Sequence, residues 1–157
     1  MLKDYITPEG YAKLESELKY LWKVKRPEIA EKVKEAAAMG DRSENAEYIY
    51  GKKQLRETDR RTRYLNKRLE HLNVVQDKPD NREQVFFGAR ITVEDEQEKT
   101  FTYRIVGSDE IGDCKENISF KSPFAKAILG KHLDDEFSFM LGDKRQSFLI
   151  IKVDYDG

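Results

Sequence analysis

The chain has 157 residues, enough for one ordinary domain or two small ones. Charged residues and hydrophobic residues each make up 38% of it, so the core is modest for the length. The single Cys114 excludes an internal disulfide and a thiolate metal cluster. No apolar run approaches the ~20 residues of a membrane helix, and nothing resembles a signal peptide. We therefore expect a cytoplasmic protein without a membrane partner.

The net charge of −1 hides an asymmetry between the two halves of the chain. Residues 1–75 hold 17 Lys and Arg against 13 Asp and Glu, whereas residues 76–157 hold 12 against 17. A basic half and an acidic half suggest two modules, of which the basic one is better suited to contact a polyanion.

The first helical segment is predicted from its start signals and from an apolar stripe. Thr7 and Pro8 are residue types preferred as the N-cap and as the first residue of a helix. The stripe advances in steps of three and four residues, except for one longer step that contains Pro27. Because proline removes a helical hydrogen bond, we expect a kink near Trp22–Pro27, and we expect Gly40 to end the helix. The stripe consists of Tyr11, Leu14, Leu18, Leu21, Ile29, Val33 and Ala36.

A second helix follows almost at once, and a short connection forces two long helices into an antiparallel coiled-coil hairpin. Its seam positions also alternate in steps of three and four residues. Several of them are small in the half nearest the connection, where we expect a thinner and less tightly held pair. The seam positions are Tyr48, Gly51, Leu55, Thr58, Thr62, Leu65, Leu69 and Leu72.

Residues 77–84 are polar and contain proline, so they are the predicted linker between a hairpin at 1–76 and a globular module at 85–157. In that module the pattern changes from helical to alternating, which indicates strands. Ser122 and Pro123 begin the one short helix expected there. The predicted fold class is α+β, with a helical hairpin followed by an antiparallel sheet that carries this helix. The predicted strands are Val85–Phe87, Ala89–Glu94, Phe101–Val106, Phe137–Leu141 and Ser147–Tyr155, with turns at Glu96–Glu98 and Gly142–Asp143.

The connection between the two helices carries two acidic residues, Asp41 and Glu44. One interpretation is a capping box, in which Asp41 is the N-cap of the second helix and Glu44 reaches back to it. The other interpretation is a fragment of a metal site, because Mg²⁺ commonly takes one or two carboxylates plus substrate phosphates. The remaining ligands would come from a partner, and we expect no metal to stay bound to the free protein. A long, narrow hairpin suits the delivery of such a fragment into a deep cavity.

A dense run of basic residues lies in the second helix, opposed only by Glu57 and Asp59. One interpretation is an ordinary solvated helix face. Solvated faces usually mix signs, however, and like charges three and four residues apart destabilise a helix by about a few tenths of a kcal/mol per pair. The alternative is contact with nucleic acid, whose affinity falls steeply with salt. The residues opposite the helix–helix seam are Lys53, Arg56, Arg60, Arg63 and Lys67.

Five segments of the chain resemble the bacterial transcript cleavage factors of the Gre family. The likeness covers nearly the whole chain, and the tryptophan-containing segment and the basic run are closer to the GreB branch than to the GreA branch. The segments are residues 21–28 (LWKVKRPE), 40–48 (GDRSENAEY), 52–61 (KKQLRETDRR), 85–89 (VFFGA) and 122–131 (SPFAKAILGK).

The resemblance implies a coiled coil that enters the secondary channel of RNA polymerase and a C-terminal domain of FKBP-like fold, without isomerase activity, that docks on the channel rim. Asp41 and Glu44 would help to hold a second Mg²⁺ in the polymerase active centre, and the polymerase would cleave its own backtracked RNA. The protein would be a monomeric accessory factor and not an enzyme. The resemblance also implies contact of the 3′ segment of that RNA with Lys52, Lys53, Arg56, Arg60 and Arg61, and docking through Ser122 and Pro123.

Two residues depart from the family pattern. Gly51 stands where relatives have a polar helix former, which is expected to loosen the second helix by about 1 kcal/mol. Lys121 stands where an acidic residue or Asn is more familiar, so an acidic contact with polymerase is not expected at that point.

Two other functions remain open from the sequence. The chain could be a non-catalytic binder of the same channel that regulates or inhibits polymerase, which predicts the same fold and the same docking. It could also be a free-standing coiled coil that binds nucleic acid without polymerase.

Overall fold

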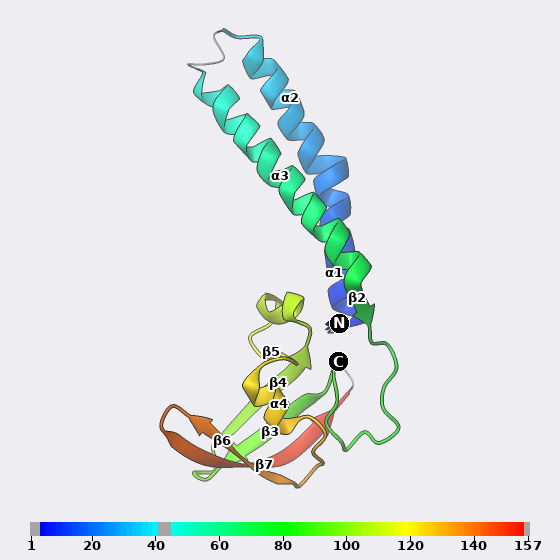
Figure 1. Ribbon diagram of the computed structural model, residues 1–157, viewed down its shortest axis with the longest axis vertical. Coiled ribbons are helices and arrows are strands. Elements are labelled where there is room, and N and C mark those ends of the chain that lie inside the picture. Colours follow the sequence, from blue (N-terminus) through cyan, green and yellow to red (C-terminus); the bar gives the residue numbers. More distant parts are fainter. Residues whose placement is uncertain (1–3, 41–44, 156–157) are drawn as a thin grey trace. The chain divides into compact units, whose positions relative to one another are not determined.

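The computed structural model describes residues 4–40 and 45–155, and the chain divides into two compact units (Figure 1). The helical unit is Tyr11–Leu72, and the globular unit combines Met1–Gly10 with Asn73–Gly157. The class α+β is confirmed. The sequence had assigned residues 1–76 to the hairpin, whereas the described residues 4–10 group with the globular unit.

The reason lies in the partners of the N-terminal strand. Strand β1 (Asp4–Ile6) pairs with β2 (Leu72–Val74), and the Tyr5 ring packs against Phe87 and Phe120 with centroid distances of 5.9 and 5.4 Å. These short strands have no alternation long enough to be recognised in the sequence.

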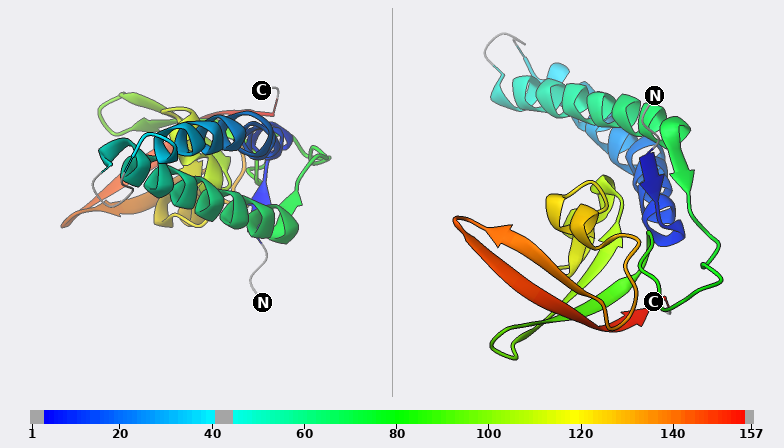
Figure 2. Two further views of the ribbon diagram at one scale, coloured as in Figure 1. Left: turned by 90° about the horizontal axis from the view of Figure 1, so that it is seen from above. Right: turned by 60° about the horizontal axis from the view of Figure 1, so that its bottom comes forward.

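The helical unit consists of α1 (Pro8–Tyr20), a π-helical segment η1 (Leu21–Lys25), α2 (Arg26–Ala37) and α3 (Ala46–His71). The segments from α1 to α2 follow one another without a break, and α3 runs back beside them, as Figures 1 and 2 both show. The predicted antiparallel pair of helices is therefore present.

The first helical stretch begins where the sequence predicted, but it ends earlier than predicted. The Thr7 hydroxyl accepts a hydrogen bond from the Gly10 amide at 3.1 Å, and Pro8 is the first helical residue, as predicted. The other end lies earlier than predicted, because α2 ends at Ala37. Gly40 follows three residues later with φ +146°, a conformation that residues with a side chain rarely adopt.

The π-helical segment stands where the sequence predicted a kink. The Arg26 amide donates to the Leu21 carbonyl, five residues earlier, so one extra residue is fitted into the helix. This is why Leu21 and Ile29, eight residues apart, are both buried, at 5% and 6% exposure. Pro27 is the second residue of α2, where its missing N–H is tolerated.

The predicted seam positions are buried or half-buried, with small residues toward the hairpin end. Gly51 and Thr58 are buried on α3, and Ala36 is buried on α2. A Cβ atom built on Gly51 would lie 2.7 Å from Cγ2 of Val33. Gly51 therefore permits a close approach of the two helices, a role that its low helix propensity alone did not predict.

The globular unit is built on a five-stranded sheet in the order β5-β4-β3-β7-β6. The prediction of an antiparallel sheet was wrong at one edge, because β5 pairs with β4 in parallel. The long β6–β7 hairpin is clear in Figure 2. The strands are β3 (Arg90–Asp95), β4 (Thr100–Val106), β5 (Asn117–Ser119), β6 (Glu136–Leu141) and β7 (Lys144–Asp154), with a 3₁₀ segment η2 (Ser108–Asp113) before β5.

The short helix α4 (Pro123–Ile128) closes the core of this unit. Ala125 and Ile128 are fully buried, and the Phe124 ring lies among four aromatic rings of the sheet at centroid distances of 5.1 to 5.9 Å. The alternating hydrophobic residues of the strands supply the rest of the core, which explains why their pattern was legible. The four rings belong to Tyr103, Phe137, Phe139 and Phe148.

The predicted strand Val85–Phe87 is absent. Its backbone instead bonds to the chain that follows α4, with the Val85 amide donating to the Lys131 carbonyl at 2.8 Å. The Phe86 amide donates to the Tyr155 hydroxyl at 2.8 Å. Burial raises the pKa of that Tyr155 hydroxyl. The apolar run is thus explained by the burial of Val85 and not by sheet pairing.

Candidate functional site

The hairpin end is the first candidate site, and its two acids, Asp41 and Glu44, lie outside the described residues. The residues on both sides of them are described. Helix α3 begins at Ala46, and its N-cap is Asn45, whose Oδ1 accepts a hydrogen bond from the Tyr48 amide at 3.1 Å. The interpretation in which Asp41 is the N-cap of the second helix was therefore wrong.

Asn45 also connects the two helices. Its Nδ2 donates to the carbonyl of Ala36, near the end of α2, at 2.7 Å. One side chain thus fixes the start of α3 and binds the last turn of α2. Sequence reasoning passed over Asn45, although asparagine directly before a helical pattern is a good N-cap signal.

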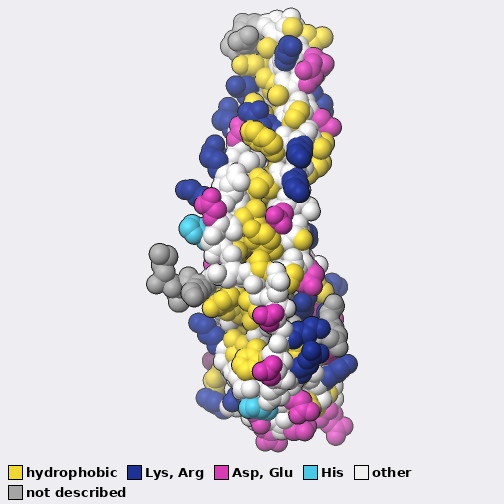
Figure 3. Space-filling model, turned by 90° about the vertical axis from the view of Figure 1, so that its right-hand side faces the viewer, with side chains coloured by type: hydrophobic (Ala, Val, Ile, Leu, Met, Phe, Trp, Pro, Cys, Tyr) yellow, Lys and Arg dark blue, Asp and Glu magenta, His cyan; other side chains and the backbone are white. Residues whose placement is uncertain are grey.

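The basic face of α3 is the second candidate site, and it consists of the five residues predicted to lie opposite the seam. All five are exposed. Within residues 4–40 and 45–155, none of the five forms an ion pair that would neutralise it. Figure 3 shows Lys and Arg side chains distributed along the helical unit. This face can therefore attract an anion from solution. Its members are Lys53, Arg56, Arg60, Arg63 and Lys67.

Two further residues predicted to contact RNA, Lys52 and Arg61, are not part of the basic face of α3. Lys52 is half-buried. Arg61 makes a two-pronged ion pair with Glu17 of α1, with Nε–Oε2 and Nη2–Oε1 distances of 2.6 and 2.9 Å. The hydrogen bond from Arg61 is the main cause that lowers the pKa of Glu17. Arg61 therefore has a structural role between helices, and its guanidinium also lies 5.2 Å from the centroid of the Tyr64 ring.

The predicted docking residues, Ser122 and Pro123, lie at the start of α4. The Ser122 hydroxyl caps the helix by accepting from the Ala125 amide at 3.3 Å, and Pro123 is its exposed first residue. The neighbouring Lys121 pairs with Asp4 of β1. The unexpected positive charge at position 121 thus has an acidic partner within its own unit.

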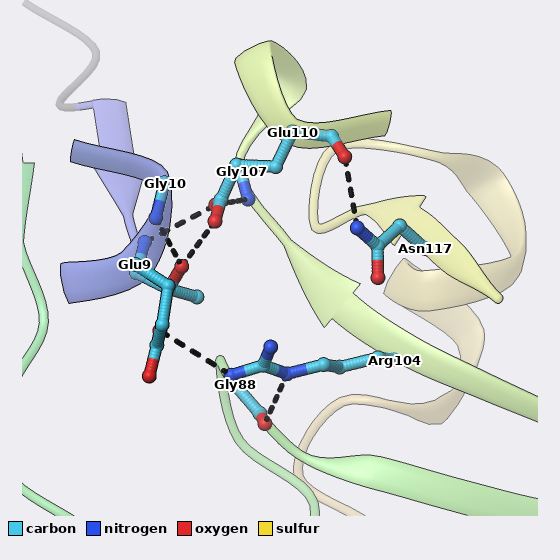
Figure 4. Close-up of polar contacts among 8 residues, drawn as sticks. Glu9, Gly10, Gly88, Arg104, Gly107, Glu110 and Asn117 are labelled. Carbon is cyan, nitrogen blue, oxygen red and sulfur yellow. Dashed lines mark hydrogen bonds and ion pairs between the residues drawn. The ribbon is translucent and has the colours of Figure 1, made fainter. Parts of the chain in front are cut away.

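Glu110 is a buried acid that sequence reasoning missed (Figure 4). It is 3% exposed, and its carboxylate accepts from the amides of Thr7 and Gly107 at 3.1 and 2.8 Å and from the Thr7 hydroxyl. A Cβ atom on Gly10 would lie 2.2 Å from Oε1, so glycine is needed there to admit the carboxylate. Glu110 is therefore a structural residue that caps the first turn of α1 within the globular unit.

No cluster of three or more His, Cys, Asp or Glu side chains placed to hold a metal occurs among the described residues. None of the described helices has the length and apolar character needed to cross a membrane.

Comparison with known proteins agrees with the two-part organisation. Residues 4–74 match the family model for the N-terminal domain of GreA/GreB transcription elongation factors, and residues 79–155 match the model for their C-terminal domain. A solved structure of the transcription factor Gfh1 is 20% identical, with a TM-score of 0.46 and coverage of 97% of each chain.

The chain is also similar over nearly its whole length to proteins named transcription elongation factor GreB. The one from Yersinia pestis is 51% identical over 152 residues, covering 97% of this chain and 89% of its own. The one from Haemophilus influenzae is 55% identical over 133 residues, covering 85% and 84%. With both domain models matched in order and identities of this size, the chain is a member of the GreA/GreB family of transcription elongation factors.

Proposed function

We propose that this elongation factor inserts its helical unit into the secondary channel of bacterial RNA polymerase and stimulates the polymerase's own cleavage of backtracked RNA. The observation that carries the proposal is the cap of α3. Because Asn45 supplies that cap, Asp41 and Glu44 are not needed to begin the helix. Their carboxylates remain candidates for a role outside the protein.

In this proposal Asp41 and Glu44 would contribute ligands to a second Mg²⁺ whose other ligands belong to the polymerase active centre. Carboxylate oxygens are suitable donors for Mg²⁺, which commonly binds one or two of them together with phosphate oxygens and water. The ion would stabilise the attacking and leaving oxygens of the hydrolysis. The contribution of this chain is to hold the pair at the end of a stiff support, and Asn45 is the positioning residue that ties both helices together next to it.

The basic face would attract the 3′ segment of the backtracked RNA. Five exposed cations without ion-pair partners among the described residues give a polyanion a track along α3. Binding to a single strand through Z such contacts gives a salt slope of about −0.7Z. Truncation of any one of the five, for example Arg60→Ala, should reduce that slope by less than about one unit.

The globular unit would dock on the polymerase at the rim of the channel, through the surface that begins at Ser122 and Pro123. Pro123 is exposed at the first turn of α4, where a partner can reach it. Lys121 is held by Asp4, so the positive charge next to this surface is partly neutralised. The protein would act as a monomer in the cytoplasm.

RNA cleavage in stalled elongation complexes, measured across a Mg²⁺ series, tests the proposal. Asp41→Asn and Glu44→Gln should each abolish most of the stimulation and raise the Mg²⁺ concentration needed for the remainder. Glu47→Gln is the matched control, because Glu47 is an exposed acid in the first turn of α3. Stimulation that survives both the Asp41→Asn and the Glu44→Gln substitution would contradict the proposal.

The same variants separate the proposal from a non-catalytic regulator of the channel. Such a regulator would bind polymerase and change elongation equally well with Asp41→Asn or with the original residue. Competition for polymerase between the variant and the unchanged protein measures binding independently of cleavage.

A further inference from the structure

Trp22 is the only tryptophan of the chain and is unusually exposed for a residue of that size, at 60%. It lies in the π-helical segment, whose residues from Trp22 to Lys25 are all exposed. Insertions of this kind are frequent at functional sites. An exposed indole among cations requires an explanation that neither the seam nor the basic face of α3 provides.

The indole forms one wall of a groove of about 310 Å³ along the helix pair. The size lies at the lower end of the range of small-ligand sites. Leu18 and Thr62 are the less exposed residues of the lining, and Lys19 and Lys23 add two exposed basic side chains. The lining residues are Leu18, Lys19, Trp22, Lys23, Thr62 and Asn66, all of the helical unit.

The Trp22 ring has a charged neighbour, Arg26. The Arg26 guanidinium carbon lies 5.8 Å from the ring centroid, and Arg26 Nε is held by Asp59 Oδ1 at 2.8 Å. A guanidinium near an indole is attracted to its π-system. Arg26, which is paired with Asp59, therefore places a cation next to the indole.

The groove lies beside the basic face of α3 on the surface of that helix. At about 100° per residue, Arg63 and Lys67 lie roughly 60° and 100° around the helix from Asn66, which lines the groove. Figure 3 shows hydrophobic side chains along the helical unit, with Lys and Arg side chains beside them and Asp and Glu side chains interspersed. The helical unit holds 16 Lys and Arg against 11 Asp and Glu, so its field favours an anionic ligand.

We propose that this groove, the Trp22 groove, binds one unpaired nucleotide of a single-stranded RNA, with the base stacked on the indole and the flanking phosphates contacted by Lys19 and Lys23. Aromatic side chains flanked by cations are the usual platform for single strands, because every base presents a π-face. Charge favours RNA over a protein partner, since Lys, the residue type of both cations that line the groove, is depleted at protein–protein interfaces. The inference deepens the proposed function, on which it rests, by adding a stacking contact to the electrostatic one.

Direct observation of the indole tests the inference, because a single tryptophan makes the emission specific to Trp22. The full chain is titrated with an unstructured oligouridylate, which should quench the emission. A perfect duplex RNA of the same length should leave the emission unchanged, because its bases are already stacked. Equal quenching by both RNAs, or none by either, would overturn the inference.

Affinity of a labelled oligouridylate provides the second measurement. Loss of one base–aromatic stack corresponds to about a 5- to 150-fold weaker affinity, and we expect Trp22→Leu to fall in this range. Trp22→Phe should recover most of the loss. Tyr20→Leu is the matched control, because Tyr20, two residues before Trp22, is 52% exposed but does not line the groove. Circular dichroism confirms that each variant is folded.

The two proposals fail in different ways. The titration contains no polymerase. Quenching by oligouridylate and the weaker RNA affinity of Trp22→Leu should therefore persist even if Asp41→Asn and Glu44→Gln leave RNA cleavage unchanged. Conversely, if Trp22→Leu binds oligouridylate like the unchanged protein, the groove proposal is refuted, while the RNA cleavage assay of the Asp41 and Glu44 variants is unaffected. A Trp22→Leu variant that binds RNA normally and polymerase poorly would assign the groove to a protein contact, which also refutes it.

Discussion

Substitution of Gly51 by alanine should destabilise the helical unit, although alanine is the better helix former. In a helix interior alanine is more favourable than glycine by about 0.8–1.0 kcal/mol. Against this, the new Cβ would lie 2.7 Å from Cγ2 of Val33, which is too close for two carbon atoms. Forcing an extra methyl group into a packed seam typically costs about 1–3 kcal/mol. The expected net loss of unfolding free energy is therefore about 0–2 kcal/mol.

Removal of the Val33 methyl groups should reverse the sign. In a Val33→Ala background nothing remains for the new Cβ to strike, so Gly51→Ala should stabilise by about 1 kcal/mol. The difference between the two backgrounds is a coupling free energy of about 1–3 kcal/mol, of the size found for residues in contact.

Urea unfolding of the four chains, followed by circular dichroism at 222 nm, measures these values. The signal comes mainly from the helical unit, which contains all the long helices of the described chain. If Gly51→Ala stabilised the chain equally with Val33 and with Val33→Ala, the helix–helix seam would accommodate a methyl group at position 51 without a clash. The explanation of Gly51 as a residue of close approach would then be wrong.

Substitutions at three further residues test other contacts. Glu110→Gln should lower the free energy of unfolding of the globular unit by about 1–3 kcal/mol in urea titrations, because hydrogen bonds to a buried carboxylate are lost; an unchanged midpoint would show that the charge is dispensable. Asn45→Ala should lower the thermal stability of the helical unit by about 1 kcal/mol, whereas Asn45→Asp, which keeps the capping oxygen but cannot donate to Ala36, should retain most of it. Because the pKa of Glu17 is lowered in the folded state, its pairing with Arg61 stabilises above the carboxyl's unfolded pKa and is lost as pH falls through the folded value. Glu17→Gln should therefore cost less than about 1 kcal/mol at pH 7, and the difference should vanish in acid; a difference that persists there would exclude the ion pair as its cause.

The helical unit was largely predictable because its spacing rules are local. The steps of three and four residues gave the seam, and the same register placed Lys53 and Arg60 on the exposed face. The one step of eight residues marked an irregularity, but it did not reveal a π-helical insertion. A proline within that step pointed to a kink, whereas the inserted residue accounts for the spacing.

The features that were missed depend on contacts between residues far apart in the chain. Nothing near Glu110 indicates that it is buried, since its partner Thr7 is 103 residues away. The parallel edge strand β5 is three residues long and carries no usable alternation. Val85–Phe87 had the composition of a strand, but its backbone is satisfied by the loop after α4 and by Tyr155.

The division of the chain bears on the order in which it folds during synthesis. Residues 11–72 are contiguous and form one compact unit, so the helix pair can form soon after it leaves the ribosome. Thr7, however, must await Glu110, and at about 5–20 residues per second the interval is roughly 5–20 s. Throughout that period Thr7 and Gly10 lack the Glu110 carboxylate that packs against them in the folded protein. The helical unit can therefore form first. The globular unit is completed only when its two segments, which are translated many seconds apart, have both been synthesised.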